Sequence, residues 1–221
     1  MVYAIILSMD RRLNIVETTW SRKLAYVIGL ITSDGNLSPD GRHINITSKD
    51  LEIVSMAKKA LSLKNKIGKK ARGGETEKKY YVLQFGSKNF YAFLLSIGLT
   101  PAKSKTIKRV LVPDAFFVDF LRGCIDGDGS ITESRHPESA HIQLRLSLVS
   151  ASKPFLLWIL ESVRRMLGAR GGGITVLTDK SICMLRFGKQ DSIQILKAMY
   201  AHTEGYTLKR KFQKAKKYLG E

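Results

Sequence analysis

Residues 27–35 (VIGLITSDG) and residues 121–129 (LRGCIDGDG) align without a gap, and this pair of stretches decides the fold. Each stretch is apolar, has a glycine at its third position and ends in Asp-Gly. The sequence that follows repeats as well, because residues 83–86 (LQFG) match residues 185–188 (LRFG). Internal similarity of this kind predicts two related halves in one chain. Two such halves imitate a two-fold dimer, with pseudo-symmetry in place of symmetry.

The pattern of apolar and polar residues predicts the same order of elements in each half. A motif helix is followed by a turn and by an alternating strand, at 43–47 in the first half and 142–148 in the second. An amphipathic helix then begins near Ser48 or Ser152, residue types that favour N-caps. Further elements are predicted at 68–72, 79–85 and 88–97, then at 173–178, 181–187 and 192–201, with a basic helix at 208–219. Helices and strands mixed without a parallel βαβ order indicate the α+β class.

The repeat divides the chain of 221 residues into four parts. We expect an N-terminal extension at 1–20, a first half at 21–100, a linker at 101–113 and a second half at 114–221. The linker is basic and holds two prolines, and the second half ends in the basic helix. Because both halves lie in one chain, we expect the protein to be a monomer.

The chain carries far more positive than negative charge. Lys and Arg number 37 against 19 Asp and Glu, which gives a formal charge of +18 and a pI near 10.0. Unpaired charge is too costly to bury, so the surplus lies on the surface. Such a surface repels other copies of the protein unless a polyanion is near. Nucleic acid is the first candidate partner, an anionic membrane surface is the second, and a merely solvated basic surface is the remaining alternative.

The sequence also bears on the compartment. No apolar run is long enough to span a bilayer, and the short apolar stretch at 2–9 has no basic residue before it and is a poor signal peptide. We therefore expect the cytoplasm of a prokaryote or the matrix of an organelle. Cys124 and Cys183 lack metal-ligand spacing and are expected to be buried free thiols in a reducing environment.

The two motif helices are predicted to pack against each other. Gly29 and Ser33 are four residues apart, as are Gly123 and Gly127, so each pair lies on one face of its helix. Small residues on facing sides allow two helix backbones to approach closely. If the helices meet along this face, both end at one place.

That shared end is a candidate metal site, because Asp34 and Asp128 then lie side by side. A lone Asp-Gly pair is usually a simple cap or turn, but two matched copies in so basic a chain favour chemistry. Two carboxylates at the negative ends of helices repel each other, and a divalent cation relieves that repulsion. Carboxylates and free backbone carbonyls, here those of Ser33 and Gly127, are ligands that magnesium prefers. A metal beside a phosphodiester can generate hydroxide and stabilise the leaving oxygen.

The alternating strands are predicted to present a polar face to DNA. One strand offers His43, Asn45 and Thr47, and the other offers His141, Gln143, Arg145 and Ser147. Their apolar faces must meet helices, so the polar faces are free for base edges in the major groove, where Arg suits guanine and Gln suits adenine. A merely solvated strand face is the alternative. Nearby polar residues extend the predicted surface: Lys70, Arg72, Lys79, Gln84 and Arg186.

With these residues in place, the two stretches resemble the motif of the LAGLIDADG homing endonucleases, of the monomeric kind with two motifs. The acid that binds metal in that family is the eighth residue of the motif, which is Asp34 and Asp128 here. The first stretch departs from the pattern at its sixth position, where Thr32 stands in place of an acid. The resemblance covers about residues 22–219. It implies two αββαββα-type halves whose antiparallel sheets form a saddle over DNA, with the motif helices at the centre.

The resemblance also implies a function. It predicts a site-specific endonuclease that uses Mg²⁺ to hydrolyse both strands of duplex DNA across the minor groove and leaves 3′ overhangs. Ca²⁺ is expected to support binding with little cleavage. The target is expected to be long and pseudo-palindromic, and the gene to lie in an intron or stand free. Lys103 and Lys211 resemble the lysines that surround the central water network of the family, with the register of Lys211 open by two residues. Ordinary phosphate contacts are the alternative role for both.

Other classes remain open at this stage. A LAGLIDADG-type RNA maturase would use the same basic surface on structured intron RNA, and a dual role is compatible with the residues. A non-cleaving DNA-binding protein would keep the surface and lose the chemistry. A basic ribosomal or membrane-surface protein would account for the charge and leave the paired motifs unexplained.

Overall fold

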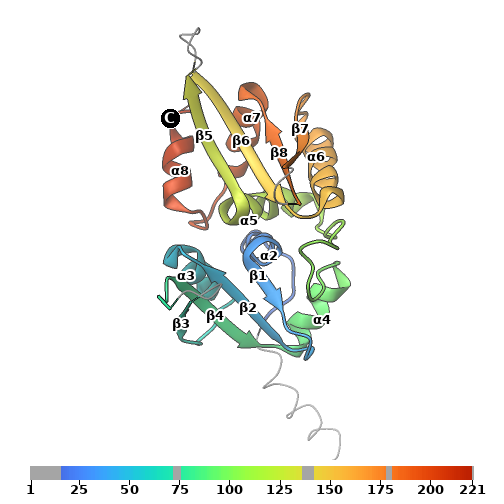
Figure 1. Ribbon diagram of the computed structural model, residues 1–221, viewed down its shortest axis with the longest axis vertical. Coiled ribbons are helices and arrows are strands. Elements are labelled where there is room, and N and C mark those ends of the chain that lie inside the picture. The colour runs from blue at the N-terminus through green and yellow to red at the C-terminus, as the bar shows by residue number, and fades with distance from the viewer. Residues whose placement is uncertain (1–15, 72–75, 136–141, 178–180, 221) are drawn as a thin grey trace, which may run out of the picture.

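The computed structural model describes residues 16–71, 76–135, 142–177 and 181–220, and Figure 1 shows two halves of like design. The first half holds α2 (Arg22–Asp34), β1 (Gly35–Leu37), β2 (His43–Ser48), α3 (Leu51–Ala60), β3 (Ile67–Lys70), β4 (Tyr80–Gly86) and α4 (Lys88–Ser96). The second half holds α5 (Phe117–Asp128), β5 (Gly129–Arg135), β6 (Ile142–Ser150), α6 (Lys153–Leu167), β7 (Gly173–Leu177), β8 (Ile182–Phe187) and α7 (Lys189–Tyr200). A 3₁₀ turn (Asp114–Phe116) precedes α5, and α8 (Lys209–Lys216) follows α7. The α+β class and the αββαββα order of both halves are confirmed.

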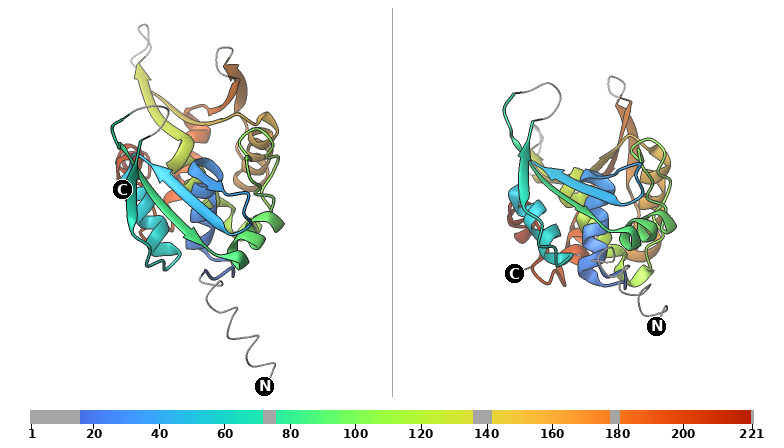
Figure 2. Two further views of the ribbon diagram at one scale, coloured as in Figure 1. Left: turned by 60° about the horizontal axis from the view of Figure 1, so that its bottom comes forward. Right: turned by 90° about the horizontal axis from the view of Figure 1, so that it is seen from below.

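Each half builds one four-stranded antiparallel sheet. The strand orders are β1-β2-β4-β3 and β5-β6-β8-β7, which are the same order in the two halves. The motif helices α2 and α5 lie side by side between the sheets (Figure 1). The strands of both halves run along one side of the molecule and the helices along the other, as the right-hand view of Figure 2 shows. The two sheets, one in each half, therefore lie on the same side of the molecule.

The close approach of α2 and α5 depends on glycine. A Cβ atom on Gly29 would lie 2.2 Å from the carbonyl oxygen of Phe120, and a Cβ atom on Gly123 would lie 2.1 Å from that of Tyr26. Real Cβ atoms do not come so near to backbone, so only glycine permits these two helices to touch at this point. Gly127 meets Ser33 in the same way further along, where a Cβ atom would lie 2.0 Å from the serine Oγ.

Two local expectations from the sequence are wrong. The segment after each Asp-Gly is a strand, β1 or β5, and not a turn. Leu37 and Ile131 bury their side chains there, and pairing with β2 or β6 supplies the backbone hydrogen bonds. Ser48 does not cap a helix either. It ends β2, its Oγ accepts from the N–H of Asp50 at 3.2 Å, and α3 begins only at Leu51.

Ser152 does cap α6, because its Oγ accepts a hydrogen bond from the N–H of Phe155 at 3.4 Å. Cys124 and Cys183 are buried and free, as the sequence predicted. Within the part of the chain that the structure describes, no helix is both long enough and apolar enough to cross a bilayer.

Candidate active site

The two motif helices end at one polar cavity. Asp34 is the last residue of α2 and Asp128 is the last residue of α5, and both line a cavity of about 530 Å³. The Oδ2 atom of Asp34 lies beside α5, only 3.3 Å from where a Cβ atom on Gly127 would be. The two carboxylates thus share one site, as the repeat predicted. Other lining residues come from both halves: Ser33, Gly35, Asn36, Asn45, Thr47, Lys70, Ala102, Lys103, Ser104, Val149, Ser150, Ala151 and Ile182.

Lys103 reaches this cavity from the turn that follows α4. Its side chain is only 4% exposed, and its Nζ donates a hydrogen bond to the carbonyl of Gly35. Burial lowers the pKa of Lys103 to about 8, because the charged form loses hydration, while the carboxylates of Asp128 and Asp34 favour the charged form. A lysine held in this way titrates near physiological pH, next to both motif acids.

Lys211 lies at the equivalent place in the second half. It comes from the first turn of α8, is 3% exposed, and its Nζ donates to the carbonyls of Ile125, Asp126 (2.8 Å) and Gly129 (2.7 Å). Burial lowers the pKa of Lys211 to about 8, and Asp126 acts in the opposite direction. Gly35 and Gly129 are the ninth residues of the two motifs, so the two lysines contact corresponding carbonyls.

The two halves differ at the sixth position of the motif. Asp126, at the sixth position of the second motif, is fully buried, and burial raises its pKa. Its Oδ2 accepts hydrogen bonds from the hydroxyl of Tyr26 and the N–H of Leu208, both at 2.9 Å. Thr32, at the sixth position of the first motif, donates only to Ile28 of its own helix, at 2.7 Å. The sequence marked this position as different but gave no partner for Asp126.

Arg122, at the second motif position, is a further buried group that the sequence did not single out. Its guanidinium forms an ion pair with Asp119 at 2.7 Å and donates to the carbonyls of Met199 (2.7 Å) and Tyr206 (2.9 Å). The arginine therefore ties α5 to the segment that joins α7 to α8. These partners lie 77 and 84 residues away along the chain, so no local pattern indicates them.

The first-half sheet presents a polar surface on its open side. His43, Asn45 and Thr47 alternate along β2 with buried Ile44 and Ile46. The register pairs Asn45 with Asn36 on one side and with Gln84 on the other, so three amide side chains form a row across the sheet. Lys70 ends β3 at the cavity. Lys79 precedes β4 and forms an ion pair with Glu77 at 3.0 Å. The His43 ring contacts the side chain of Asp40, and this hydrogen bond lowers the pKa of Asp40 to about 2.

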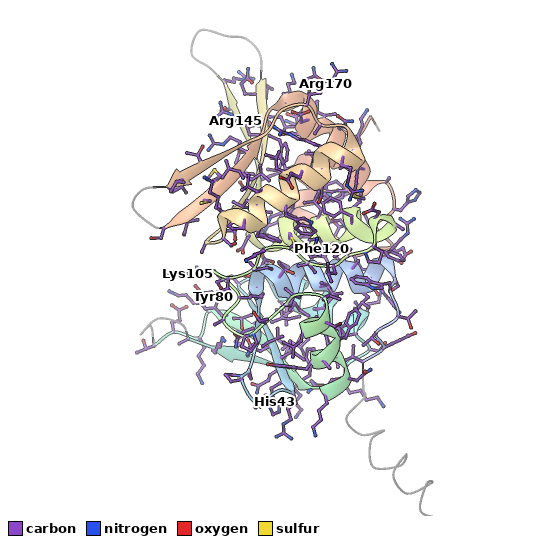
Figure 3. All side chains as sticks on the ribbon, turned by 90° about the vertical axis from the view of Figure 1, so that its right-hand side faces the viewer. His43, Tyr80, Lys105, Phe120, Arg145 and Arg170 are labelled. Carbon is purple, nitrogen blue, oxygen red and sulfur yellow. The ribbon has the colours of Figure 1, made fainter. Side chains whose placement is uncertain are left out.

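The second-half sheet presents two arginines, Arg145 and Arg186, besides the amide of Gln143. Arg145 is exposed and lies opposite Thr132. Ser147 lies opposite Arg186 but is only 5% exposed, so it has little surface to offer a ligand. Figure 3 shows Arg145 on the second-half sheet and Tyr80 on the first-half sheet, with Phe120 at the boundary between the halves. Gln143 is half-buried on the same strand face as Arg145, while His141 and Arg72 lie outside the described residues.

The residues at the motif ends fit a divalent cation that also binds its substrate. Among the described residues there is no group of three or more His, Cys, Asp and Glu side chains that could hold a metal. Asp34 and Asp128 supply two hard carboxylate ligands beside backbone at the helix ends. Magnesium usually binds through one or two carboxylates and completes its shell with water and substrate phosphates. The Ser33 hydroxyl donates back to the carbonyl of Gly29 at 3.1 Å. The backbone carbonyls of Ser33 and Gly127 stay predicted ligands.

Comparison with known proteins agrees with this architecture. A family model described as a LAGLIDADG-like domain matches residues 21–98. The first half of the chain is therefore a LAGLIDADG-like domain, and the second half repeats its fold. A search of curated protein sequences found no match.

Solved structures resemble the whole chain. Full-length DUF199/WhiA from Thermatoga maritima matches with a TM-score of 0.57 and 17% identity over 92% of this chain, which spans 62% of that protein. The LAGLIDADG homing endonuclease I-LtrWI, bound to its target DNA, matches with a TM-score of 0.57 and 12% identity, covering 89% of this chain and 87% of that one. I-DmoI in complex with DNA and Mn matches with a TM-score of 0.52 and 21% identity, covering 82% and 98%. At these identities the likeness establishes the fold.

Proposed function

We propose that the protein is a site-specific, metal-dependent endonuclease that cuts both strands of duplex DNA. One observation carries the proposal: Asp34 and Asp128, one from each half, line a single polar cavity together with buried Lys103. These two acids stand at the negative ends of helices that touch through glycine, where like charges repel each other. A stability role does not account for that repulsion, whereas a divalent metal relieves it.

The residues have separate tasks in this proposal. Asp34 and Asp128 hold divalent metal, for which we propose Mg²⁺, and the metal supplies Lewis acidity for hydrolysis when bound. Lys103 adds positive charge beside the reacting phosphate, where such charge stabilises the transition state. The two sheets lie along the duplex and their outward side chains contact base edges. Because the halves are pseudo-symmetric, the proposed target is long and pseudo-palindromic, and each half serves one strand.

The similar structures support a DNA partner and a metal. I-LtrWI is described as bound to target DNA, and I-DmoI as complexed with DNA and Mn or with DNA in the presence of Mg. For this chain we propose cleavage across the minor groove with 3′ overhangs, Ca²⁺ that permits binding with little turnover, and action as a monomer. An intron-encoded origin, with intron RNA as a second partner, belongs to the same proposal.

A non-cleaving DNA-binding protein is the second candidate, because the fold also matches DUF199/WhiA. The two candidates share the basic surface and differ in what they need from the motif ends. A pure binding protein has no use for two acids that repel the phosphates of its ligand. Retention of Asp34 and Asp128 therefore favours the endonuclease.

The test separates binding from cleavage. Duplexes that the protein cuts are first selected from a random library with Mg²⁺, and the selected site is then used with Asp34→Asn and Asp128→Asn. Each substitution removes a negative charge near DNA, so we expect binding to be kept or strengthened while double-strand cleavage falls by at least a hundredfold. Asp114→Asn makes the same charge change at an exposed residue paired with Arg165, and it should cut like the wild type.

Three results decide the matter. Cleavage that is lost in both motif variants and kept in Asp114→Asn supports the endonuclease. Tight duplex binding without cleavage at any site, in Mg²⁺ or Mn²⁺, favours the DNA-binding protein. Preference for structured RNA over duplex DNA in competition favours the maturase.

A further inference from the structure

The two motifs differ most at their sixth position, and the difference reaches beyond the motif helices. In the first half the hydroxyl of Thr32 bonds only within its own helix. In the second half the carboxylate of Asp126 has no exposed surface and bonds to two other elements. One partner is Tyr26 in α2, and the other is the N–H of Leu208, the residue before α8.

The contact with Leu208 bears on Lys211, which follows three residues later in the first turn of α8. Asp126 accepts from Leu208 through its side chain at 2.9 Å and from the Lys211 ammonium through its backbone carbonyl at 2.8 Å. One residue of the motif therefore holds both ends of the first turn of α8. A buried helix start without an acceptor leaves its N–H groups unsatisfied, which is costly in a dry site.

Lys103 has no such arrangement. It sits in the turn after α4, where the carbonyl of Ile107 accepts a hydrogen bond from the hydroxyl of Ser152 in the other half. The residue that corresponds to Asp126 in the first motif is Thr32, whose hydroxyl donates to the carbonyl of Ile28 within its own helix. The first turn of α8, which carries Lys211, is thus bonded to Asp126, whereas the turn that carries Lys103 is bonded to Ser152.

We propose that Asp126 is a positioning residue that holds Lys211 at the end of α5 and thereby controls cleavage of one DNA strand but not the other. The strand assignment rests on the proposed function, in which each half serves one strand. The positioning itself rests only on the contacts of Asp126, Leu208 and Lys211.

The way Asp126 is bonded makes the proposal sharp. Both of its hydrogen bonds use Oδ2, and Oδ1 has no hydrogen-bond partner among the described residues. An asparagine side chain can place its amide oxygen where Oδ2 is, so that both hydrogen bonds are kept, and its NH₂ group where Oδ1 is. Asp126→Asn should therefore preserve the position of Lys211, while Asp126→Ala removes the acceptor. A metal ligand or catalytic acid would not tolerate asparagine, and we expect Asp128→Asn, two residues away, to abolish cleavage.

The first experiment measures the nicking rate of each strand under single-turnover conditions, on a supercoiled plasmid that carries the selected site. Asp126→Ala should slow one strand tenfold or more relative to the other, and Lys211→Met should slow the same strand. Asp126→Asn should stay within threefold of wild type on both strands. Thr32→Val, the matched change in the first motif, should leave both rates unaltered. Equal slowing of both strands by Asp126→Ala, or an asparagine variant as impaired as the alanine variant, overturns the proposal.

A second measurement needs no cleavage and separates the proposal from the proposed function. Lysines of the DNA-free protein are reductively methylated, and modification of Lys211 and Lys103 is followed by mass spectrometry. Both should be protected in the wild type, and Asp126→Ala should expose Lys211 at least tenfold while Lys103 stays protected. Leu208→Pro provides a second route if Asp126→Ala does not fold. The φ angle of Leu208, −73°, suits proline. Proline has no N–H, so this change removes the hydrogen bond to Asp126 by deleting its donor.

The outcomes are distinct. Exposure of Lys211 in a protein that cuts no DNA upholds the positioning role and refutes the endonuclease. Protection of Lys211 in both Asp126→Ala and Leu208→Pro refutes the positioning role, whatever the cleavage assay shows.

Discussion

Replacing the buried lysine of the cavity should make the protein more stable and less active. Lys103 is 4% exposed, and its ammonium donates to the backbone carbonyl of Gly35. Methionine has a similar length and flexibility and carries no charge to desolvate. We therefore expect Lys103→Met to raise the free energy of unfolding at neutral pH and to slow cleavage of the selected duplex, which is the usual conflict between stability and a functional site.

The magnitude follows from the pKa of the lysine. A fall from 10.5 to about 8 corresponds to roughly 3 kcal/mol against the charged form in the folded state. Loss of the hydrogen bond to Gly35 lowers this stability gain by about 1 kcal/mol. The net gain at pH 7 is then about 2 kcal/mol, or roughly 4–8 °C in Tm for a chain of this size.

The pH dependence gives the prediction its sign. At pH 7 and below the lysine is mostly protonated in both states, so nearly the full penalty is present in the wild type. Between about pH 8 and 10.5 the unfolded chain binds more protons than the folded one, and the unfolding free energy of the wild type rises with pH. The advantage of Lys103→Met should therefore shrink steadily across that window.

The assay is urea unfolding of wild type and variant from pH 7 to pH 10, followed by circular dichroism. Lys105→Met is the matched control, because Lys105, labelled in Figure 3, lies two residues away and is exposed. It should leave stability within about 0.5 kcal/mol at every pH. A Lys103→Met protein that is less stable than wild type at pH 7, or whose advantage does not change with pH, would refute the reasoning.

Three other changes probe the packing, the DNA surface and the metal. Gly29→Ala drives a Cβ atom against the Phe120 carbonyl and should cost about 1–3 kcal/mol or more in thermal unfolding. Gly173→Ala, with open space around the added Cβ atom, should cost little, and equal Tm values for the two variants would contradict the helix contact. Arg145→Ala should cost roughly 1–3 kcal/mol of binding free energy on the selected site and relax the sequence preference at one or two base pairs. Lys216→Ala, at an exposed residue, should weaken binding to all duplexes alike. A cleavage profile in which Arg145→Ala lowers activity equally for every single-base change would count against base contact by Arg145. Chelator should stop cleavage and added Mg²⁺ should restore it, while undiminished cutting in chelator rules out a metal site at the motif ends.

Much of the fold follows from the repeat. The sequence predicted that Gly29 and Gly123 lie on facing sides of two packed helices, because the small residues recur at a spacing of four in both copies. Once the helices touch there, the acids at their ends meet without further information. Alternation along β2 predicted correctly which face is buried, since a one-residue slip would expose both isoleucines. Along β6 it holds for Leu144, Leu146 and Leu148, but Ser147 on the opposite face is buried as well.

The sequence failed where distant residues decide the structure. Ser48 and Ser152 looked equivalent as N-caps, but Ser48 is the last residue of β2, where it pairs with Tyr81. Strand β1 is three residues long, too short for alternation to be recognised. The bond between Asp126 and Leu208 spans 82 residues and joins a motif to a helix that the repeat does not include. Contacts of this kind have no local signature.

The central claim is that the two motif acids bind metal beside a DNA strand, and diffraction can test it most directly. A crystal of the protein with its selected duplex and Mn²⁺, measured at the manganese edge, should show anomalous density within coordination distance of both Asp34 and Asp128 and of a backbone phosphate of the DNA. Metal bound only elsewhere, or a duplex lying away from the open side of the sheets, would contradict the account.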